Sequence, residues 1–148
     1  MKIIANNKRA TYDYEISQKI NSGLVLTGSE VKSLRNNSSS IKEAYVEEQN
    51  GELWLSNCYI KKYHSSSQKE NDPIRKRKLL ISKKELNKLL GSIKKEGFSI
   101  VPLSIYFSDN GYVKLSIGLG KGKKRFDKRQ TQKTKDWNKN KQRLLKNN

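Results

Sequence analysis

Apolar residues in the first 119 positions come in short runs separated by turn-forming pairs, which is typical of antiparallel strands. Two such pairs stand out, Asn50-Gly51 and Asn110-Gly111. Because Asn and Gly tolerate positive φ, each pair predicts a tight two-residue turn between two strands. The predicted hairpin strands are residues 45–48 with 52–55, and residues 101–107 with 112–117.

The second hairpin also indicates which side chains face the core. Apolar residues occupy every second position, and this period places them on one face of a strand. Two further strands are expected at residues 11–16 and 23–26. The residues predicted to share the buried face are Val101, Leu103, Ile105 and Phe107 on one strand and Val113, Leu115 and Ile117 on the other.

Two helices are predicted. The longer begins after Ser82, because Ser82 and Glu85 have the spacing of a capping box. Its apolar residues recur at helical spacing and should cover the sheet, and Gly97 can end it in the left-handed conformation. The shorter helix is expected at residues 29–35. The inward positions are Leu86, Leu89, Leu90 and Ile93 in the longer helix and Val31 and Leu34 in the shorter.

About six short strands with two or three helices predict a mainly β, β-rich α+β fold. We expect a small, closed, OB-like antiparallel β-barrel, because closure removes open edges and leaves one face for oligonucleotides. This barrel should span residues 1–120. Residues 121–148 hold too few large apolar side chains to offset the entropy of ordering them, so they predict a basic C-terminal tail that is disordered when free.

Charge narrows the function most. Lys and Arg total 32 and Asp and Glu total 14, which gives a net charge of +18. Residues 120–148 alone carry twelve Lys or Arg against two Asp. A chain this basic attracts polyanions, of which nucleic acid and a membrane surface are the main candidates. No apolar stretch approaches the ~18 residues that span a bilayer, so we expect the partner to be a nucleic acid and not a membrane.

Residues that carry enzymatic chemistry are scarce. One cysteine, Cys58, and one histidine, His64, cannot form a zinc site of the usual ligand types. There is no Walker-type phosphate loop and no pair of carboxylates in an apolar setting. We therefore expect that the protein is not an enzyme and that it binds no metal and no cofactor. The single cysteine and an N-terminus too polar for a signal peptide predict a cytoplasmic protein.

Two basic clusters are candidate RNA contacts. Residues 75–78 precede an apolar segment that must pack, so their charges should be held rigidly and reach phosphates; the other reading is a solvated face. Residues 121–129 are the densest cluster, where Phe126 offers a face for a base to stack on. Glycines at 118, 120 and 122 would let the backbone leave the last strand there. The other reading of this cluster is a solubility tail.

Three stretches of the chain resemble one family. Residues 23–35, 72–80 and 120–129 are similar, in order and spacing, to the signatures of the SsrA-binding protein (small protein B) family. The resemblance implies an OB-like barrel that binds the tRNA-like domain of transfer-messenger RNA (tmRNA) and delivers it to stalled ribosomes for trans-translation. It also implies that the tail occupies the vacant decoding centre and mRNA channel of the small subunit and becomes helical there.

The resemblance assigns roles to individual residues. Glu30 and Lys114 match RNA-binding positions, and the other candidate RNA contacts are Lys32, Arg35, Arg75, Arg77, Lys78, Lys121, Lys123 and Lys124. The candidate ribosome contacts in the tail are Phe126, Asp127, Lys128, Arg129, Trp137, Leu144 and Leu145. Phe126 stands where relatives often have His or Tyr, so its role would be stacking. We expect a monomer; the alternative function is a ribosomal or other structural rRNA-binding protein.

Overall fold

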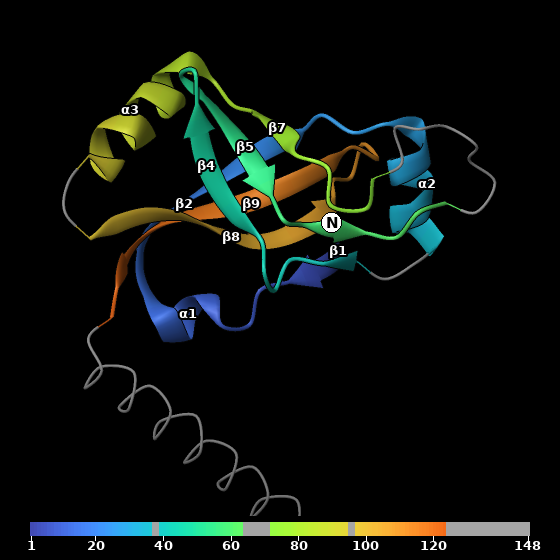
Figure 1. Ribbon diagram of the computed structural model, residues 1–148, viewed down its shortest axis with the longest axis horizontal. Helices are drawn as coiled ribbons and strands as arrows, with labels where there is room; N and C mark the ends of the chain where they lie inside the picture. Colours follow the sequence, from blue (N-terminus) through green and yellow to red (C-terminus); the bar gives the residue numbers. More distant parts are fainter. Residues whose placement is uncertain (37–38, 64–71, 95–96, 124–148) are drawn as a thin grey trace, which may run out of the picture.

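The computed structural model describes residues 1–36, 39–63, 72–94 and 97–123. Within them, nine strands and three helices follow one another along the chain (Figure 1). The elements are β1 (Lys2–Asn6), α1 (Ala10–Asp13), β2 (Tyr14–Leu24), α2 (Gly28–Asn36), β3 (Ser39–Ser40), β4 (Tyr45–Gln49), β5 (Glu52–Ser56), β6 (Tyr59–Ile60), β7 (Arg77–Leu80), α3 (Lys83–Ile93), β8 (Phe98–Phe107) and β9 (Val113–Gly122). The mainly β class predicted from the sequence is confirmed.

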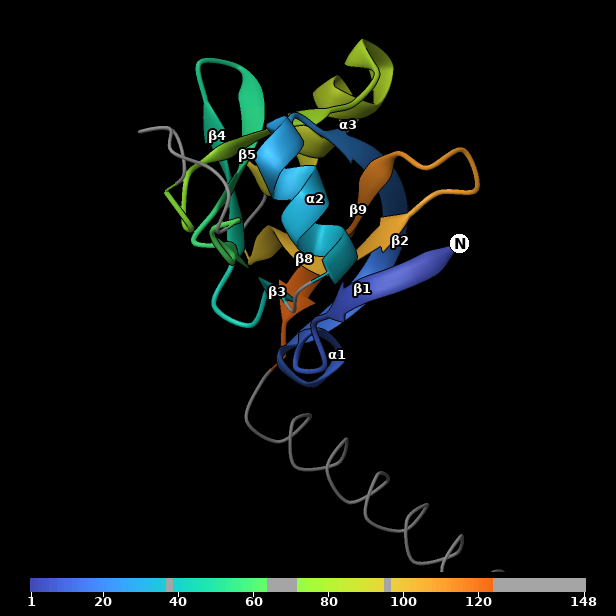
Figure 2. The same ribbon diagram turned by 90° about the vertical axis from the view of Figure 1, so that its right-hand side faces the viewer.

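Seven strands form one curved antiparallel sheet in the order β1-β8-β9-β2-β7-β5-β4, and β3 pairs with β6. Helices α2 and α3 lie at opposite ends of this sheet (Figure 1), and the turned view shows α2 in front of the curved strands (Figure 2). Each predicted helix exists, and α1 is a third, single-turn helix that the sequence pattern did not indicate. None of the described helices is long and apolar enough to cross a membrane.

The prediction of a closed barrel is not confirmed, because the described sheet has two edges, β1 and β4. Strand β4 lies beside β8 without pairing to it. Two clefts lie along this seam, one of about 370 Å³ beside Ile100 and Tyr45 and one of about 190 Å³ beside Phe98 and Val46. The sheet therefore curls as a barrel does and stays open along one line.

The two hairpins form different turns. Asn50 (φ 55°) and Gly51 (φ 78°) both have positive φ, so the first is the predicted two-residue turn between β4 and β5. In the second, only Gly111 (φ 83°) has positive φ. Ser108 accepts the Gly111 N–H at 2.9 Å and donates to Tyr112 at 2.8 Å, which closes a three-residue loop with a glycine bulge. The predicted two-residue turn at Asn110-Gly111 is wrong for this reason.

A β-bulge in β8 changes which side chains reach the core. The register with β9 shifts between Pro102 and Ser104, so the side-chain alternation reverses there. Ile105 and Phe107 face the core as predicted, but Val101 and Leu103 do not, and Ile100 takes the core position instead. The predicted inward face of β9 is correct along its whole length.

Residues 11–16 and 23–26 were predicted as two strands, but β2 is one strand of 11 residues that begins only after α1. Between the two predicted pieces, Ser17, Lys19 and Asn21 are exposed and the polar Ser22 is buried, so the apolar pattern did not reveal that the strand is continuous. The core lies between the sheet and the two larger helices, and Leu34 of α2 and Leu89 of α3 are buried in it. Ser82 caps α3 as predicted: its hydroxyl accepts the Glu85 N–H at 3.3 Å and donates to the Glu85 carboxylate at 3.0 Å.

Candidate nucleic-acid interface

Glu30 lies at the start of α2, where the local sequence fixes its backbone and side chain together. The Thr27 hydroxyl accepts the Glu30 N–H at 3.2 Å, and Glu30 Oε1 accepts the Thr27 N–H at 2.9 Å. This reciprocal pair is a capping box, which the spacing of Thr27 and Glu30 could have predicted. It turns the Glu30 carboxylate back toward the body of the protein.

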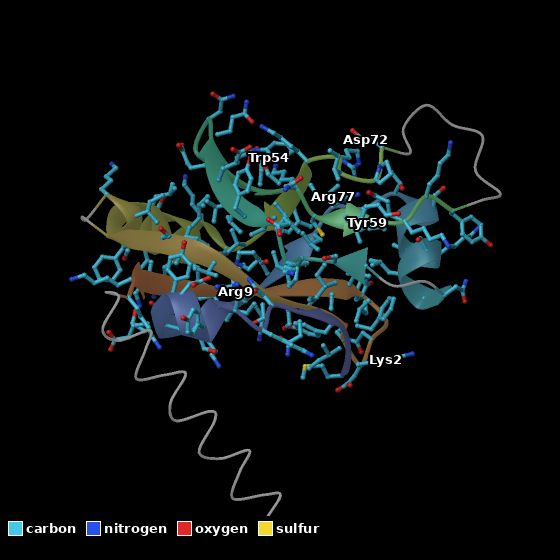
Figure 3. All side chains as sticks on the ribbon, turned by 60° about the horizontal axis from the view of Figure 1, so that its bottom comes forward. Lys2, Arg9, Trp54, Tyr59, Asp72 and Arg77 are labelled. Atoms are coloured by element: carbon cyan, nitrogen blue, oxygen red, sulfur yellow. The ribbon has the colours of Figure 1, made fainter. Side chains whose placement is uncertain are left out.

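Two arginines from the segment leading into β7 meet that carboxylate. Arg75 Nη2 lies 2.5 Å from Oε1, and Arg77 Nε lies 2.6 Å from Oε2. Arg77 is fully buried and also donates to the Cys58 carbonyl at 2.6 Å and the Pro73 carbonyl at 3.2 Å. Figure 3 places Arg77 in the interior near β6, which carries Tyr59. One carboxylate thus joins α2, β7 and the chain on either side of β6.

The electrostatics agree with this geometry. Burial alone would raise the pKa of Glu30, but the hydrogen bonds from Arg75 and Thr27 and the charge of Arg77 outweigh it and hold the pKa below its ordinary value of 4.5. Burial also raises the pKa of the neighbouring Cys58 thiol to about 11, so it stays protonated and unreactive. Cys58 is fully buried.

The structure places Glu30 and Arg77, both predicted RNA contacts, in the interior of the protein. Both oxygens of Glu30 are occupied, its side chain is 7% exposed, and that of Arg77 is 0% exposed. A phosphate could reach Arg77 only by breaking a buried ion pair, which is costly. The other two members of the basic run are also paired, Lys76 with Glu47 at 2.6 Å and Lys78 with Glu52 at 2.9 Å. The run is largely neutralised within the protein.

Lys114 is differently placed. It lies on the face of the sheet that points away from the core, directly opposite Tyr106 of β8 and Gly23 of β2. The register extends this row to Ile3 of β1 and Leu80 of β7, each 53% exposed. The row crosses five strands, about 19 Å. The sequence predicted Lys114 but not the apolar residues of its row. Their only signal in the sequence was that each is an apolar residue at a position of its strand that faces outward.

A row with a lysine at its middle and exposed apolar side chains at its two ends, Ile3 and Leu80, suits RNA. Its ammonium can meet a phosphate while the apolar groups pack against ribose or base. The absence of a side chain at Gly23 leaves room for Leu80, since a Cβ at residue 23 would lie 3.1 Å from Leu80 Cβ. We call Ile3, Tyr106, Lys114, Gly23 and Leu80 the Lys114 row.

The remaining predicted cations lie at the two ends of the molecule. Lys32 and Arg35 are exposed on α2, and the Lys32 ammonium lies 5.9 Å from the centre of the Tyr63 ring. Lys121 is exposed on the far end of β9, with its ammonium 6.0 Å from the centre of the Phe98 ring. Lys124 and the tail candidates lie outside the described residues: Phe126, Asp127, Lys128, Arg129, Trp137, Leu144 and Leu145.

The glycines near the end of β9 do not release the chain from the strand, contrary to the sequence prediction. Gly118 and Gly120 are paired with β2, and their missing side chains leave space for Ile16. A Cβ at either position would lie 2.9 Å from a carbon of Ile16. The strand continues to Gly122, so Lys121 belongs to the sheet.

The described residues contain no group of three or more His, Cys, Asp or Glu side chains that could hold a metal ion. The side chains described above are suited to binding: they comprise cations, apolar side chains and a buried ion-pair cluster that fixes the loops around them.

Comparison with known proteins places these features in a family. The family model of the SmpB protein matches residues 4–147. An SsrA-binding protein of Sinorhizobium fredii is 49% identical over 145 residues, which cover 98% of this chain and 91% of that protein. One of Wolbachia sp. subsp. Brugia malayi is 51% identical over 148 residues, covering 100% and 99%. A solved structure described as "tmRNA-SmpB: a journey to the center of the bacterial ribosome" is 43% identical, with a TM-score of 0.66 over 84% of this chain and 90% of the other. The resemblance noted in the sequence is confirmed, and the chain belongs to the SmpB protein family.

Proposed function

We propose that this protein binds the tRNA-like domain of tmRNA and delivers it to stalled ribosomes for trans-translation. The observation that carries the proposal is family membership over residues 4–147, with relatives named for SsrA binding and a solved structure described as tmRNA-SmpB in the ribosome. The protein acts as an adaptor rather than an enzyme. It works as a monomer in the cytoplasm, where its ribosomal partner is found.

The Lys114 row is the proposed RNA-binding face. The curved sheet serves here as the family's OB-like barrel, with Lys114 at a phosphate and Leu80 and Ile3 against sugar or base. Lys32 and Arg35 extend the face along α2. Glu30, Arg75 and Arg77 act indirectly, because they hold the loops that border this face.

The C-terminal segment has the second role. The segment that follows Lys123 occupies the vacant decoding centre and mRNA channel, with Asp127, Lys128 and Arg129 near the reading site. Trp137, Leu144 and Leu145 form the apolar side of a helix there. Support comes from the placement of the two ends of β9, since Lys114 and Lys121 are about 23 Å apart along the strand. Two partners can therefore be held at once.

Paired variants test this division. Lys114→Met should weaken binding to the tRNA-like domain and lower the slope of log affinity against log salt by about one, while Lys83→Met, an exposed lysine on α3, should leave the domain's selectivity unchanged. Alanine at Asp127, Lys128 and Arg129 together should spare RNA affinity and abolish peptide tagging on stalled ribosomes. If the tail variant instead lost RNA affinity in proportion to the charge removed, the division of roles would be wrong.

A further inference from the structure

The point where the C-terminal segment leaves the folded part is held by specific hydrogen bonds. The Lys123 N–H donates to the Asp13 carbonyl at 2.9 Å, and the Lys123 ammonium donates to the Thr11 carbonyl at 2.7 Å. One residue earlier, the Gly122 N–H donates to the Gly97 carbonyl at 3.3 Å. The last described residues are therefore bonded on two sides, to α1 and to the start of β8.

Helix α1 supplies the carbonyls that hold Lys123. These groups lie in its last turn, where an α-helix has no internal donors left and a cation is favourable. Lys123 provides both a backbone and a side-chain donor to this turn. A residue without a side-chain donor could satisfy only one of the two carbonyls.

The helix is itself fixed to the sheet by Asn7. The Asn7 N–H donates to the Leu103 carbonyl at 2.8 Å, and its side-chain amide donates to the Pro102 carbonyl at 2.9 Å. The Asn7 carbonyl accepts the Ala10 N–H at 3.3 Å, and Ala10 is 2% exposed. Hydrogen bonds thus run from β8 through Asn7 and α1 to Lys123 (Figure 3 shows α1, which follows Arg9).

We propose that Lys123 is a positioning residue, and that α1 is the anchor through which the folded part sets where the C-terminal segment begins. This inference rests on the proposed ribosomal role of that segment. Its consequence is a limit on reach. From a fixed Lys123, Asp127 can lie at most about 14 Å away, because an extended chain spans ~3.5 Å per residue.

Release of the anchor would enlarge that reach. If the end of β9 frays back to Gly120, seven residues rather than four separate the fixed point from Asp127, and its reach grows to about 25 Å. The volume it can search grows about fivefold, so its effective concentration at a fixed ribosomal site falls about fivefold. The tRNA-like domain, bound through the other end of β9, is unaffected.

A double-mutant cycle tests the anchor against simple loss of charge. Lys123→Met keeps the aliphatic stem and removes the ammonium, and Asn7→Ala removes the side-chain hydrogen bond to the Pro102 carbonyl of β8. The matched controls are Lys83→Met, which removes the same charge at an exposed position of α3, and Asn87→Ala, at another exposed position of that helix. Each full-length variant is assayed for peptide tagging at limiting protein, for affinity to the tRNA-like domain, and for hydrogen exchange at the Gly122 and Lys123 amides.

The expected result is about a fivefold loss of tagging for Lys123→Met and for Asn7→Ala, with no further loss when they are combined, because both break one chain of contacts. Exchange at Gly122 and Lys123 should speed up in both variants, and RNA affinity should match that of Lys83→Met. Equal tagging by Lys123→Met and Lys83→Met, or additive losses in the double variant, would overturn the anchor. The triple tail variant, measured alongside, reports separately on the proposed ribosomal role.

Discussion

Glu30 is the charge on which the segments around α2 depend. It accepts from Arg75, Arg77 and Thr27 in a setting with little water. Replacing it with Gln would keep the shape of the side chain and leave two arginines, one of them fully buried, without a counter-charge. Glu30 therefore holds the loops around α2 in place.

Glu30→Gln should lower the free energy of unfolding by roughly 3–5 kcal/mol, the usual cost of removing one partner of a buried ion pair. Urea denaturation of the variant and the parent measures this. Glu43→Gln is the control, because Glu43 is exposed, and surface substitutions of this kind change stability by less than about 0.5 kcal/mol. Equal stability of the two variants would show that the cluster contributes nothing to the fold.

The same cluster predicts a pH dependence. The pKa of Glu30 is lower in the folded state than its ordinary value of 4.5, so the unfolded chain takes up this proton first as pH falls. The stabilisation from Glu30 is complete above about pH 4.5 and is lost as pH drops through the lower folded-state pKa. Unfolding free energies of the parent should therefore fall more steeply than those of Glu30→Gln over this acidic range; parallel curves would refute the assignment.

At the scale of elements, two glycines test whether local packing or local propensity decides stability. A Cβ on Gly120 of β9 would lie 2.9 Å from Ile16 Cδ1 and 3.0 Å from Tyr14 Cβ, whereas a Cβ on Gly91 of α3 meets nothing within 4 Å. Gly120→Ala should destabilise by about 1–3 kcal/mol through overpacking. Gly91→Ala should stabilise by about 0.5–1 kcal/mol through helix propensity. Thermal unfolding gives both signs, and a stabilising Gly120→Ala would contradict the packing of β2 on β9.

The elements that the sequence predicted well are those with local signals. Asn50-Gly51 and the Ser82 cap depend on residues a few positions apart, and both formed as expected. The failures are features decided over long separations. The bulge between Pro102 and Ser104 reverses a strand's faces without any change in its apolar pattern. The partners of Glu30 stand 45 and 47 residues away in the chain, so no spacing rule could place them beside it.

At the scale of the whole molecule, the charge of +18 and the family's signatures were readable from the sequence, but the division of the cations was not. Residues 75–78 read as a free basic patch, yet folding pairs each of them with a carboxylate. Lys114, isolated in the sequence, shares a row with the exposed side chains of Ile3 and Leu80 because five strands bring that row together. The functional surface follows from sheet register, which charge counting does not contain.

The central claim is that the folded part selects the tRNA-like domain and does not merely attract phosphate. The most direct test is the affinity of the full-length protein for that domain and for a structured RNA of equal length, measured across a salt series. We expect the protein to prefer the tRNA-like domain by several kcal/mol, and this preference should persist as salt rises because contacts that read shape do not release counterions. Equal affinities with the same steep salt dependence would contradict it, and a general rRNA-binding protein would then be the better description.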